Sequence, residues 1–218
     1  MSERTIEEYL ESVGALERLE NPVRTSSLAQ VLEVSPASVS EMLQRLSKKG
    51  LVQYAPYGGA TLTEEGRQRV LELTRRHRLW EVFLNRYLGM DWEDVYQEAC
   101  NLEHATSHLV TERLAQFLDN PEVCPHGNPI PKDNYELPEV PGIPLTELEI
   151  GQLGNLVSVI SESNAKFLHY LSSLSLIPGA KVKMLEKASF DGTLTIEVND
   201  SIRAIGPQAA SFIMVEPV

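Results

Sequence analysis

The spacing of apolar positions changes along the chain and predicts where helices and strands lie. Apolar residues recur every three or four positions in the first 120 residues, as they do in amphipathic helices. The long stretches with this period cover residues 3–19, 35–49, 63–88 and 91–118, and a short one covers 25–32. From about residue 145 apolar and polar residues alternate over short runs, which is typical of strands.

Residues 25–49 are expected to form a short helix, a tight turn and a longer helix, the order of a helix-turn-helix. Ser35 is expected to cap the second helix, Pro36 suits its first position, and Gly50 ends it. The boundaries of the motif therefore follow from local backbone chemistry.

Two β-prone runs, 51–54 and 60–63, flank a turn at 56–59 and predict a hairpin, the wing of a winged helix. Winged helices bind DNA or, in some proteins, another protein. We expect DNA, because basic residues cluster in this region, and small hydroxyl residues at the start of the second helix can approach base edges and phosphates closely. The expected DNA contacts are Ser35, Pro36, Ala37, Ser38, Ser40, Gln44, Arg45, Lys48, Lys49 and Tyr57.

The last third of the chain predicts a small barrel. Residues 120–144 are rich in proline and indicate an ordered loop followed by a linker. Beyond them a short helix is expected at 166–174. The expected strands are 156–160, 180–185, 193–198, 201–205 and 210–215. The fold class is mainly α with a small β domain: a winged helix-turn-helix (1–72), metal-binding and dimerisation helices (73–140) and a β-barrel (145–218).

Charge is unevenly distributed. The chain carries a formal net charge of −12, yet residues 21–78 hold nine basic and five acidic residues, a local excess of +4. A basic patch attracts phosphates, whereas the acidic remainder suits a protein that concentrates cations. No apolar run approaches a membrane span and the start has no signal-peptide pattern, so we expect a cytoplasmic protein.

Side chains that bind transition metals recur at helical spacing. His77 and Glu81 lie one turn apart, and Cys100, Glu103 and His104 share one face of the next long helix. A thiolate, a carboxylate and an imidazole on one face form a ligand set for a borderline transition metal. Each residue alone is more often solvated, paired or buried without function, but two clusters on neighbouring helices favour a metal site.

Two further pairs could join these clusters. Glu8 and Glu11 lie one turn apart on the first helix, either as a solvated acidic face or as hard oxygen ligands. Cys124 and His126 could both reach one ion from an extended segment, or could be unrelated loop residues. The only two cysteines are far apart in sequence, and in a reducing compartment ligands are favoured over a disulfide.

Three functions fit these features: a metal-dependent DNA-binding regulator, a metalloenzyme such as a hydrolase, and a metal buffer. The sequence has no nucleophile elbow, glycine-rich phosphate loop or zinc-protease motif, and an enzyme would leave the basic winged helix unexplained, so no enzyme is expected. The apolar faces of residues 63–88 and 91–118 exceed what one protomer needs to cover, which predicts a homodimer.

The order of winged helix, metal-bearing helices and small barrel resembles the diphtheria toxin repressor/MntR family of metal-dependent transcriptional regulators, over nearly the whole chain. The motifs that carry the resemblance are Arg76-His77-Arg78-Leu79 with Glu81, Glu98-Ala99-Cys100-Asn101-Leu102-Glu103-His104 and His126-Gly127-Asn128-Pro129-Ile130-Pro131. The third region resembles the family's SH3-like (FeoA-type) domain, through Val159-Ile160-Ser161-Glu162 and Leu176-Ile177-Pro178-Gly179-Ala180.

The resemblance implies roles for the candidate ligands. Cys100, Glu103 and His104 fall where the family has regulatory-site ligands, together with Glu8 and Glu11 of the first helix. The second-site residues are His77 and Glu81, with Cys124, His126 and an acidic residue of the SH3-like domain, for which Glu162 is the candidate. Tyr96 stands where iron-type members carry a second-site histidine, so that version of the site is not expected.

The resemblance also implies a mechanism: a bound metal acts as corepressor, and the loaded homodimer represses metal-uptake or homeostasis genes from a palindromic double-stranded DNA operator. Carboxylate-rich sites suit Mn(II), whereas the sulfur of Cys100 moves the preference toward Fe(II), Co(II) or Zn(II). Mn(II) is the expected corepressor, and Fe(II) is the alternative.

Overall fold

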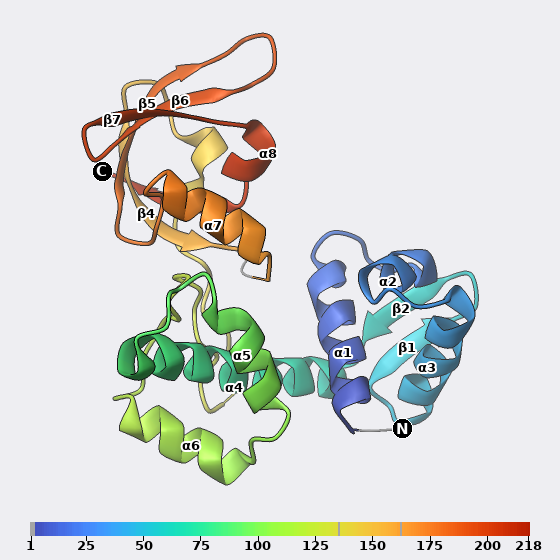
Figure 1. Cartoon of the computed structure of the whole chain (residues 1–218). Coiled ribbons are helices and arrows are strands. Elements are labelled where there is room, and N and C mark those ends of the chain that lie inside the picture. The colour runs from blue at the N-terminus through green and yellow to red at the C-terminus, as the bar shows by residue number, and fades with distance from the viewer. Residues whose placement is uncertain (1–2, 135, 162) are drawn as a thin grey trace. The chain divides into compact units, whose positions relative to one another are not determined.

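A computed structural model describes residues 3–134, 136–161 and 163–218 (Figure 1). The chain divides into two compact units: Met1–Arg76 with Pro131–Glu136, and His77–Ile130 with Leu137–Val218. None of the helices among the described residues has both the length and the apolar character needed to cross a bilayer.

The first unit contains the predicted helix-turn-helix. Its helices are α1 (Glu3–Glu17), α2 (Thr25–Val31) and α3 (Pro36–Lys48). The Ser35 side chain accepts a hydrogen bond from the Ser38 N–H, and Pro36 occupies the first turn, as predicted. One apolar core joins α1, α2 and α3 to the hairpin that follows. Its fully buried leucines are Leu10, Leu28, Leu43 and Leu46.

The wing is a two-stranded antiparallel hairpin of β1 (Val52–Ala55) and β2 (Gly59–Leu62). Its turn closes where the Gly58 N–H donates to the Ala55 carbonyl. The turn holds Tyr57 at φ 64°, a left-handed conformation that is unfavourable for a residue with a side chain. Val23 pairs with Ala60, so the hairpin is fixed to the segment before α2.

Helix α4 (Glu64–Leu88) is the longest helix and carries two of the predicted ligands. It begins where the Thr63 side chain accepts from the Gly66 N–H, and it ends before Gly89 at φ 68°. Its residues from His77 onward belong to the second unit.

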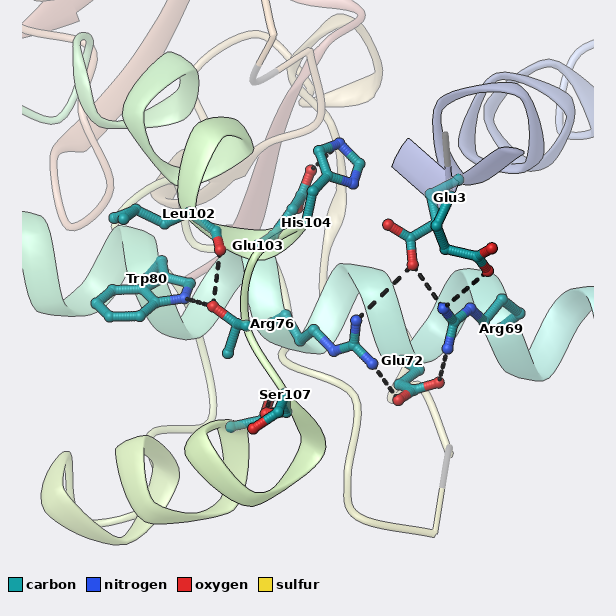
Figure 2. A network of polar contacts seen from close by, with 12 residues as sticks. Glu3, Arg69, Glu72, Arg76, Trp80, Leu102, Glu103, His104 and Ser107 are labelled. Carbon is teal, nitrogen blue, oxygen red and sulfur yellow. Dashed lines mark hydrogen bonds and ion pairs between the residues drawn. The ribbon is translucent and has the colours of Figure 1, made fainter. Parts of the chain in front are cut away.

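The sequence predicts one helix over residues 91–118, possibly interrupted, and the structure has two: α5 (Val95–Glu103) and α6 (His108–Phe117). The Thr106 hydroxyl donates to the Leu102 carbonyl, and the Ser107 hydroxyl accepts from the Val110 N–H. Hydroxyl residues that bond to nearby backbone in this way end one helix and cap the next. The Trp80 indole of α4 donates to Thr106 and fixes this break (Figure 2).

The barrel is a six-stranded antiparallel sheet in the order β3-β8-β4-β5-β6-β7. Its strands are β3 (Ile143–Pro144), β4 (Leu153–Val159), β5 (Lys181–Lys187), β6 (Leu194–Val198), β7 (Ser201–Ile205) and β8 (Ile213–Pro217). Helix α7 (Ala165–Ser173), the short α8 (Pro207–Ala210) and a 3-10 turn (Leu145–Glu147) cover its core. The strand predicted at 210–215 begins later, because Pro207 starts a helical turn ahead of it.

Candidate metal centre and DNA-binding surface

The first cluster lies between α4 and α5 in the second unit. His77 Nδ1 lies 2.9 Å from Glu103 Oε2 and 3.8 Å from Cys100 Sγ. One ligand atom from each of these three residues falls within 4.8 Å of the other two. His104 directly follows α5, and its Nε2 lies 3.4 Å from Glu103 Oε1. Two residues of the predicted face, Cys100 and Glu103, therefore meet His77, and His104 lies beside Glu103.

The second cluster contains Glu81, Cys124 and His126, all buried. His126 Nδ1 lies 3.2 Å from Glu81 Oε1 and 3.8 Å from Cys124 Sγ. The two residues 124 and 126, predicted either as ligands or as unrelated loop residues, thus lie together against α4. The second cluster therefore combines a carboxylate, a thiol and an imidazole, as the first cluster does.

His77, which the prediction grouped with Glu81 at the second site, contacts Glu81 and also the first cluster. Its Nδ1 faces the first cluster, and its Nε2 lies 3.1 Å from Glu81 Oε1. The four-residue spacing correctly placed both side chains on one face of α4. Which partners each meets depends on where α5 and the loop with Cys124 approach α4.

Buried carboxylates dominate the electrostatics of His77. Burial opposes the charged imidazolium, but the negative charge of Glu81 and hydrogen bonds with Cys100, Glu103 and Glu81 raise the His77 pKa well above its usual value. Burial likewise opposes charge on Glu81, yet His77 and His126 lower the pKa of that carboxyl below its usual range. Both nitrogens of His77 face carboxylates, an arrangement that holds a proton on each.

The two clusters fit a divalent cation. Glu81 is fully buried, and its Oε2 has no hydrogen-bond partner among the described residues, which is costly for a carboxylate unless a cation approaches it. The carboxylates are hard donors, the imidazoles intermediate and the thiolates soft, a mixture that suits first-row transition metals. In the absence of metal, the proton on His77 provides part of the missing positive charge.

The loop that carries Cys124 and His126 is fixed to strand β4. The Val159 N–H donates to the His126 carbonyl at 2.9 Å, and the Asn128 side chain donates to the Val159 carbonyl at 2.9 Å. A Cβ at Gly127 would lie 1.8 Å from the Val157 carbonyl oxygen, so only glycine permits this approach. The barrel therefore helps to shape the second cluster.

Three residues near the clusters were not predicted to contribute. The carbonyl of Trp92 accepts a 2.7 Å hydrogen bond from His126 Nε2, and no side-chain pattern reveals a backbone acceptor. Asn128 lies in the His126-Gly127-Asn128-Pro129 motif, so the motif marked it without indicating its role. Tyr96, noted only as a replaced histidine, packs its ring 4.6 Å from that of His77.

The remaining candidate ligands lie elsewhere. Glu8 is on α1 in the first unit, with its side chain 42% exposed and 2.9 Å from Arg4 Nε. Glu11 is one turn further along α1. Because both belong to the first unit and the clusters to the second, their joining the first cluster stays a prediction. Glu162 lies outside the described residues.

The predicted DNA-binding residues form the outer face of α3 and the wing tip. Ser35, Pro36, Ala37 and Ser38 are exposed, Ser40 is half-buried, and Gln44, Arg45, Lys48 and Lys49 are exposed further along the helix. Tyr57 is fully exposed. Val39, Leu43 and Leu46 face the core, so the polar face of α3 remains available to a ligand.

The basic excess counted over residues 21–78 overstates the surface patch. Arg75, Arg76 and Arg78 are buried. Arg69 and Arg76 both contact Glu72, and Arg69 also lies 2.6 Å from the buried Glu7 of α1 (Figure 2). These arginines add to the charge counted along the sequence, but they bind carboxylates and backbone carbonyls within the protein. Their role is therefore structural. Arg45, Lys48 and Lys49 remain exposed toward the end of α3.

Comparison with protein families covers the three regions in turn. The chain matches the family models described as iron dependent repressor, N-terminal DNA binding domain over residues 1–60, and iron dependent repressor, metal binding and dimerisation domain over residues 63–132. The FeoA domain model matches residues 143–217. Both clusters lie within the second of these regions, and the helix-turn-helix lies within the first.

Individual proteins are similar over the whole chain. The iron-dependent repressor IdeR of Mycobacterium bovis is 31% identical over 227 residues, covering 98% of this chain and 97% of that protein. A manganese-dependent transcriptional repressor in complex with manganese superimposes with a TM-score of 0.88 at 30% identity, covering 98% of this chain and 100% of that chain. ScaR with bound Cd2+ gives a TM-score of 0.87 at 33% identity, covering 98% and 99%.

Proposed function

Because the chain belongs to the diphtheria toxin repressor/MntR family of iron-dependent repressors, it is a metal-dependent DNA-binding transcriptional repressor, and we propose that Mn(II) is its corepressor. The family consists of DNA-binding regulators rather than enzymes, and its partners are DNA and a second copy of the chain. We propose a palindromic operator near metal-uptake or homeostasis genes, a cytoplasmic location, and domain boundaries at 1–72, 73–140 and 145–218.

One observation carries the metal dependence: a fully buried carboxylate, Glu81, has an oxygen without a partner among the described residues, and a thiol and an imidazole surround it. A structure that buries such a group without a cation sacrifices stability, and a bound ion repays that cost. A bound divalent ion supplies positive charge to carboxylates and thiolates that otherwise repel one another.

We assign the proposed ligands to two sets. The first contains His77, Cys100 and Glu103, whose ligand atoms cluster between α4 and α5, together with His104, whose Nε2 lies 3.4 Å from Glu103 Oε1. The second contains Glu81, Cys124 and His126. Glu8 and Glu11 are added to the first set, and Glu162 to the second, on the family resemblance alone.

The choice between Mn(II) and Fe(II) depends on donor chemistry. The carboxylates Glu81 and Glu103, to which the resemblance adds Glu8 and Glu11, favour Mn(II), whereas one cysteine in each cluster moves the preference toward Fe(II). Relatives of both kinds are similar to this chain, one named iron-dependent and one manganese-dependent. We propose Mn(II) because the Cys124–His126 pair joins a carboxylate-bearing helix, the arrangement that the resemblance associates with manganese-responsive members.

The chain's own residues then act on DNA. The exposed start of α3 would enter the major groove, with Ser35, Ser38 and Gln44 near base edges and the basic residues at its end on phosphates. In a dimer, two such helices reach successive major grooves about 34 Å apart, which is why a palindromic operator is proposed.

Isothermal titration of the metal-free protein with Mn(II), Fe(II) and Zn(II), each followed by a DNA-binding assay, tests the proposal. We expect two ions per chain and operator binding that is strongest with Mn(II). Strong operator binding with Fe(II) but not Mn(II) would favour the alternative corepressor. No ion bound by the wild-type chain, with tight DNA binding throughout, would contradict metal dependence itself.

A further inference from the structure

We propose that Trp92 and Ser172 are positioning residues for the second cluster: through their hydrogen bond, helix α7 of the barrel holds His126 in the orientation in which its Nδ1 faces Glu81 and Cys124. The inference rests on the proposed metal binding and deepens it. It assigns to the barrel a role in ligand affinity that involves no ligand from the barrel itself.

The first step is the orientation of His126. A carbonyl oxygen has no proton to give, so in the 2.7 Å contact between His126 Nε2 and the Trp92 carbonyl the imidazole must be the donor. In the neutral form that can bind a metal, the ring therefore keeps its proton on Nε2, and Nδ1 is the nitrogen free to bind an ion in the cluster. The Trp92 and His126 rings also contact each other, with centroids 5.5 Å apart.

The second step is what holds Trp92. Its indole Nε1 donates to the Ser172 hydroxyl at 2.8 Å, and that hydroxyl donates to Glu93 Oε2 at 3.1 Å. Ser172 thus binds two consecutive residues of the turn that precedes α5. Trp92 also packs against the apolar core of the barrel, although it precedes α5 in sequence. His169, on the same helix as Ser172, lies 3.4 Å from Glu93 and reinforces the contact.

Together these contacts connect helix α7 to His126. The hydrogen bonds that join Ser172 to Trp92 and Glu93, and Trp92 to His126, are all 3.1 Å or shorter, and the Trp92 and His126 rings are also in contact. Groups that orient a ligand from outside the ligand set commonly change metal affinity by about ten- to a hundredfold when removed. Ser172 acts one residue further away, so we expect a smaller effect. By reciprocity, filling the second cluster must stabilise the docking of α7.

A matched set of variants tests the inference in the full-length chain. Co(II) bound to a thiolate gives a charge-transfer absorption, and in a Cys100→Ser background Cys124 is the only cysteine left to produce it. We expect Ser172→Ala to weaken Co(II) binding at Cys124 by about two- to tenfold. Ser172→Thr, which keeps the hydroxyl, should restore the affinity. Ser173→Ala is the control, because this neighbour is exposed and bonds only within α7.

Two further measurements separate positioning from general destabilisation. If Ser172 acts through its hydrogen bond with the Trp92 indole, Trp92→Phe and Ser172→Ala should weaken Co(II) binding by similar factors. The double variant should then bind Co(II) no more weakly than either single variant. Hydrogen exchange in residues 165–173 should slow when Co(II) fills the second cluster, and Ser172→Ala should abolish that protection. A variant that is merely less stable would exchange faster with and without Co(II).

The outcomes are distinguishable. If the Cys100→Ser protein gives no thiolate absorption with Co(II), the second metal site itself fails, and with it that part of the proposed function. If the absorption forms but Ser172→Ala titrates like Ser173→Ala, the second site stands and the positioning role of Ser172 is wrong. Multiplicative losses in the double variant would also contradict a shared route through Trp92.

Discussion

At the residue scale, the site is an arrangement of protons and acceptors around buried carboxylates. His77 is held between Glu81 and Glu103, and its raised pKa means that the metal-free protein keeps a proton there at neutral pH. His126, in contrast, presents Nδ1 because the Trp92 carbonyl fixes its other nitrogen. Sequence spacing identified these side chains, because side-chain type and helical period are local properties. It gave no sign of Trp92, whose contribution is a backbone carbonyl.

The proton on His77 predicts how metal affinity depends on pH. A ligand must lose its proton to bind, so Mn(II) affinity should rise with pH until the raised pKa of His77 is passed and then level off. Calorimetry in two buffers of different ionisation enthalpy measures the protons released per ion. His108→Gln is the control, since that imidazole is exposed and belongs to neither cluster. Mn(II) binding without proton release at neutral pH would contradict this protonation state.

Gly127 gives a second residue-scale prediction. Gly127→Ala would place a Cβ 1.8 Å from the Val157 carbonyl oxygen and push the loop with Cys124 and His126 away from β4. We expect the bound metal to fall from two ions to one per chain, and the free energy of unfolding to fall by about 1–3 kcal/mol. Gly179→Ala is the matched control, because it also has a positive φ but no atom within 4 Å of the added Cβ. Equal effects of the two variants would show that backbone strain, and not the close approach, matters.

At the element scale, the helices and strands follow from periodicity, caps and turns that operate within a few residues, which is why the limits of α3 and the wing were predicted well. Two of the errors have tertiary causes, and the one at β8 has a local cause. The break between α5 and α6 is held by Trp80, and the start of β8 is displaced by the turn at Pro207. Arginines of α4 that were counted as surface charge are buried against carboxylates and carbonyls.

Substitutions in helix α3 and in the wing should change the salt dependence of operator binding differently. Lys48→Ala removes one charge that we assign to a phosphate contact, so it should lower the slope of log affinity against log salt by about 1. The wing, residues 52–63, has no charged residue, so Tyr57→Ala should weaken operator binding without changing that slope. Fluorescence anisotropy over a salt series measures both. Unchanged operator affinity in either variant would remove that residue from the interface.

At the scale of the whole molecule, the order of the three regions could be predicted, because each has its own hydrophobic period, linker or turn chemistry. The sequence could not show which ligands belong to which cluster, since that depends on where α4, α5 and the loop with Cys124 meet. The apolar residues predicted to form a dimer interface fall into a buried group and an exposed group. Leu79 and Val95 are buried within the protomer, whereas Tyr87, Leu109 and Phe117 remain exposed.

The exposed residues predict which surface joins two protomers. Phe83, Leu109, Val110, Arg113, Leu114 and Phe117 line a groove of about 580 Å³ beside the end of α4. We propose this groove as the dimer interface, so Phe117→Glu should shift the protein toward monomer in sedimentation velocity. Phe190→Glu is the control, because Phe190 is fully exposed on the β5–β6 turn of the barrel. A dimer equally stable in both variants would place the interface elsewhere.

The affinity of the full-length protein for a palindromic operator, measured by anisotropy at one fixed salt concentration with excess Mn(II) and again with a chelator, tests the central claim most directly. Coupling between an effector site and a binding site is typically about 5- to 150-fold, and we predict tighter operator binding with Mn(II) by a factor in that range. The same affinity in both conditions, with Mn(II) shown to occupy the clusters, would contradict the account.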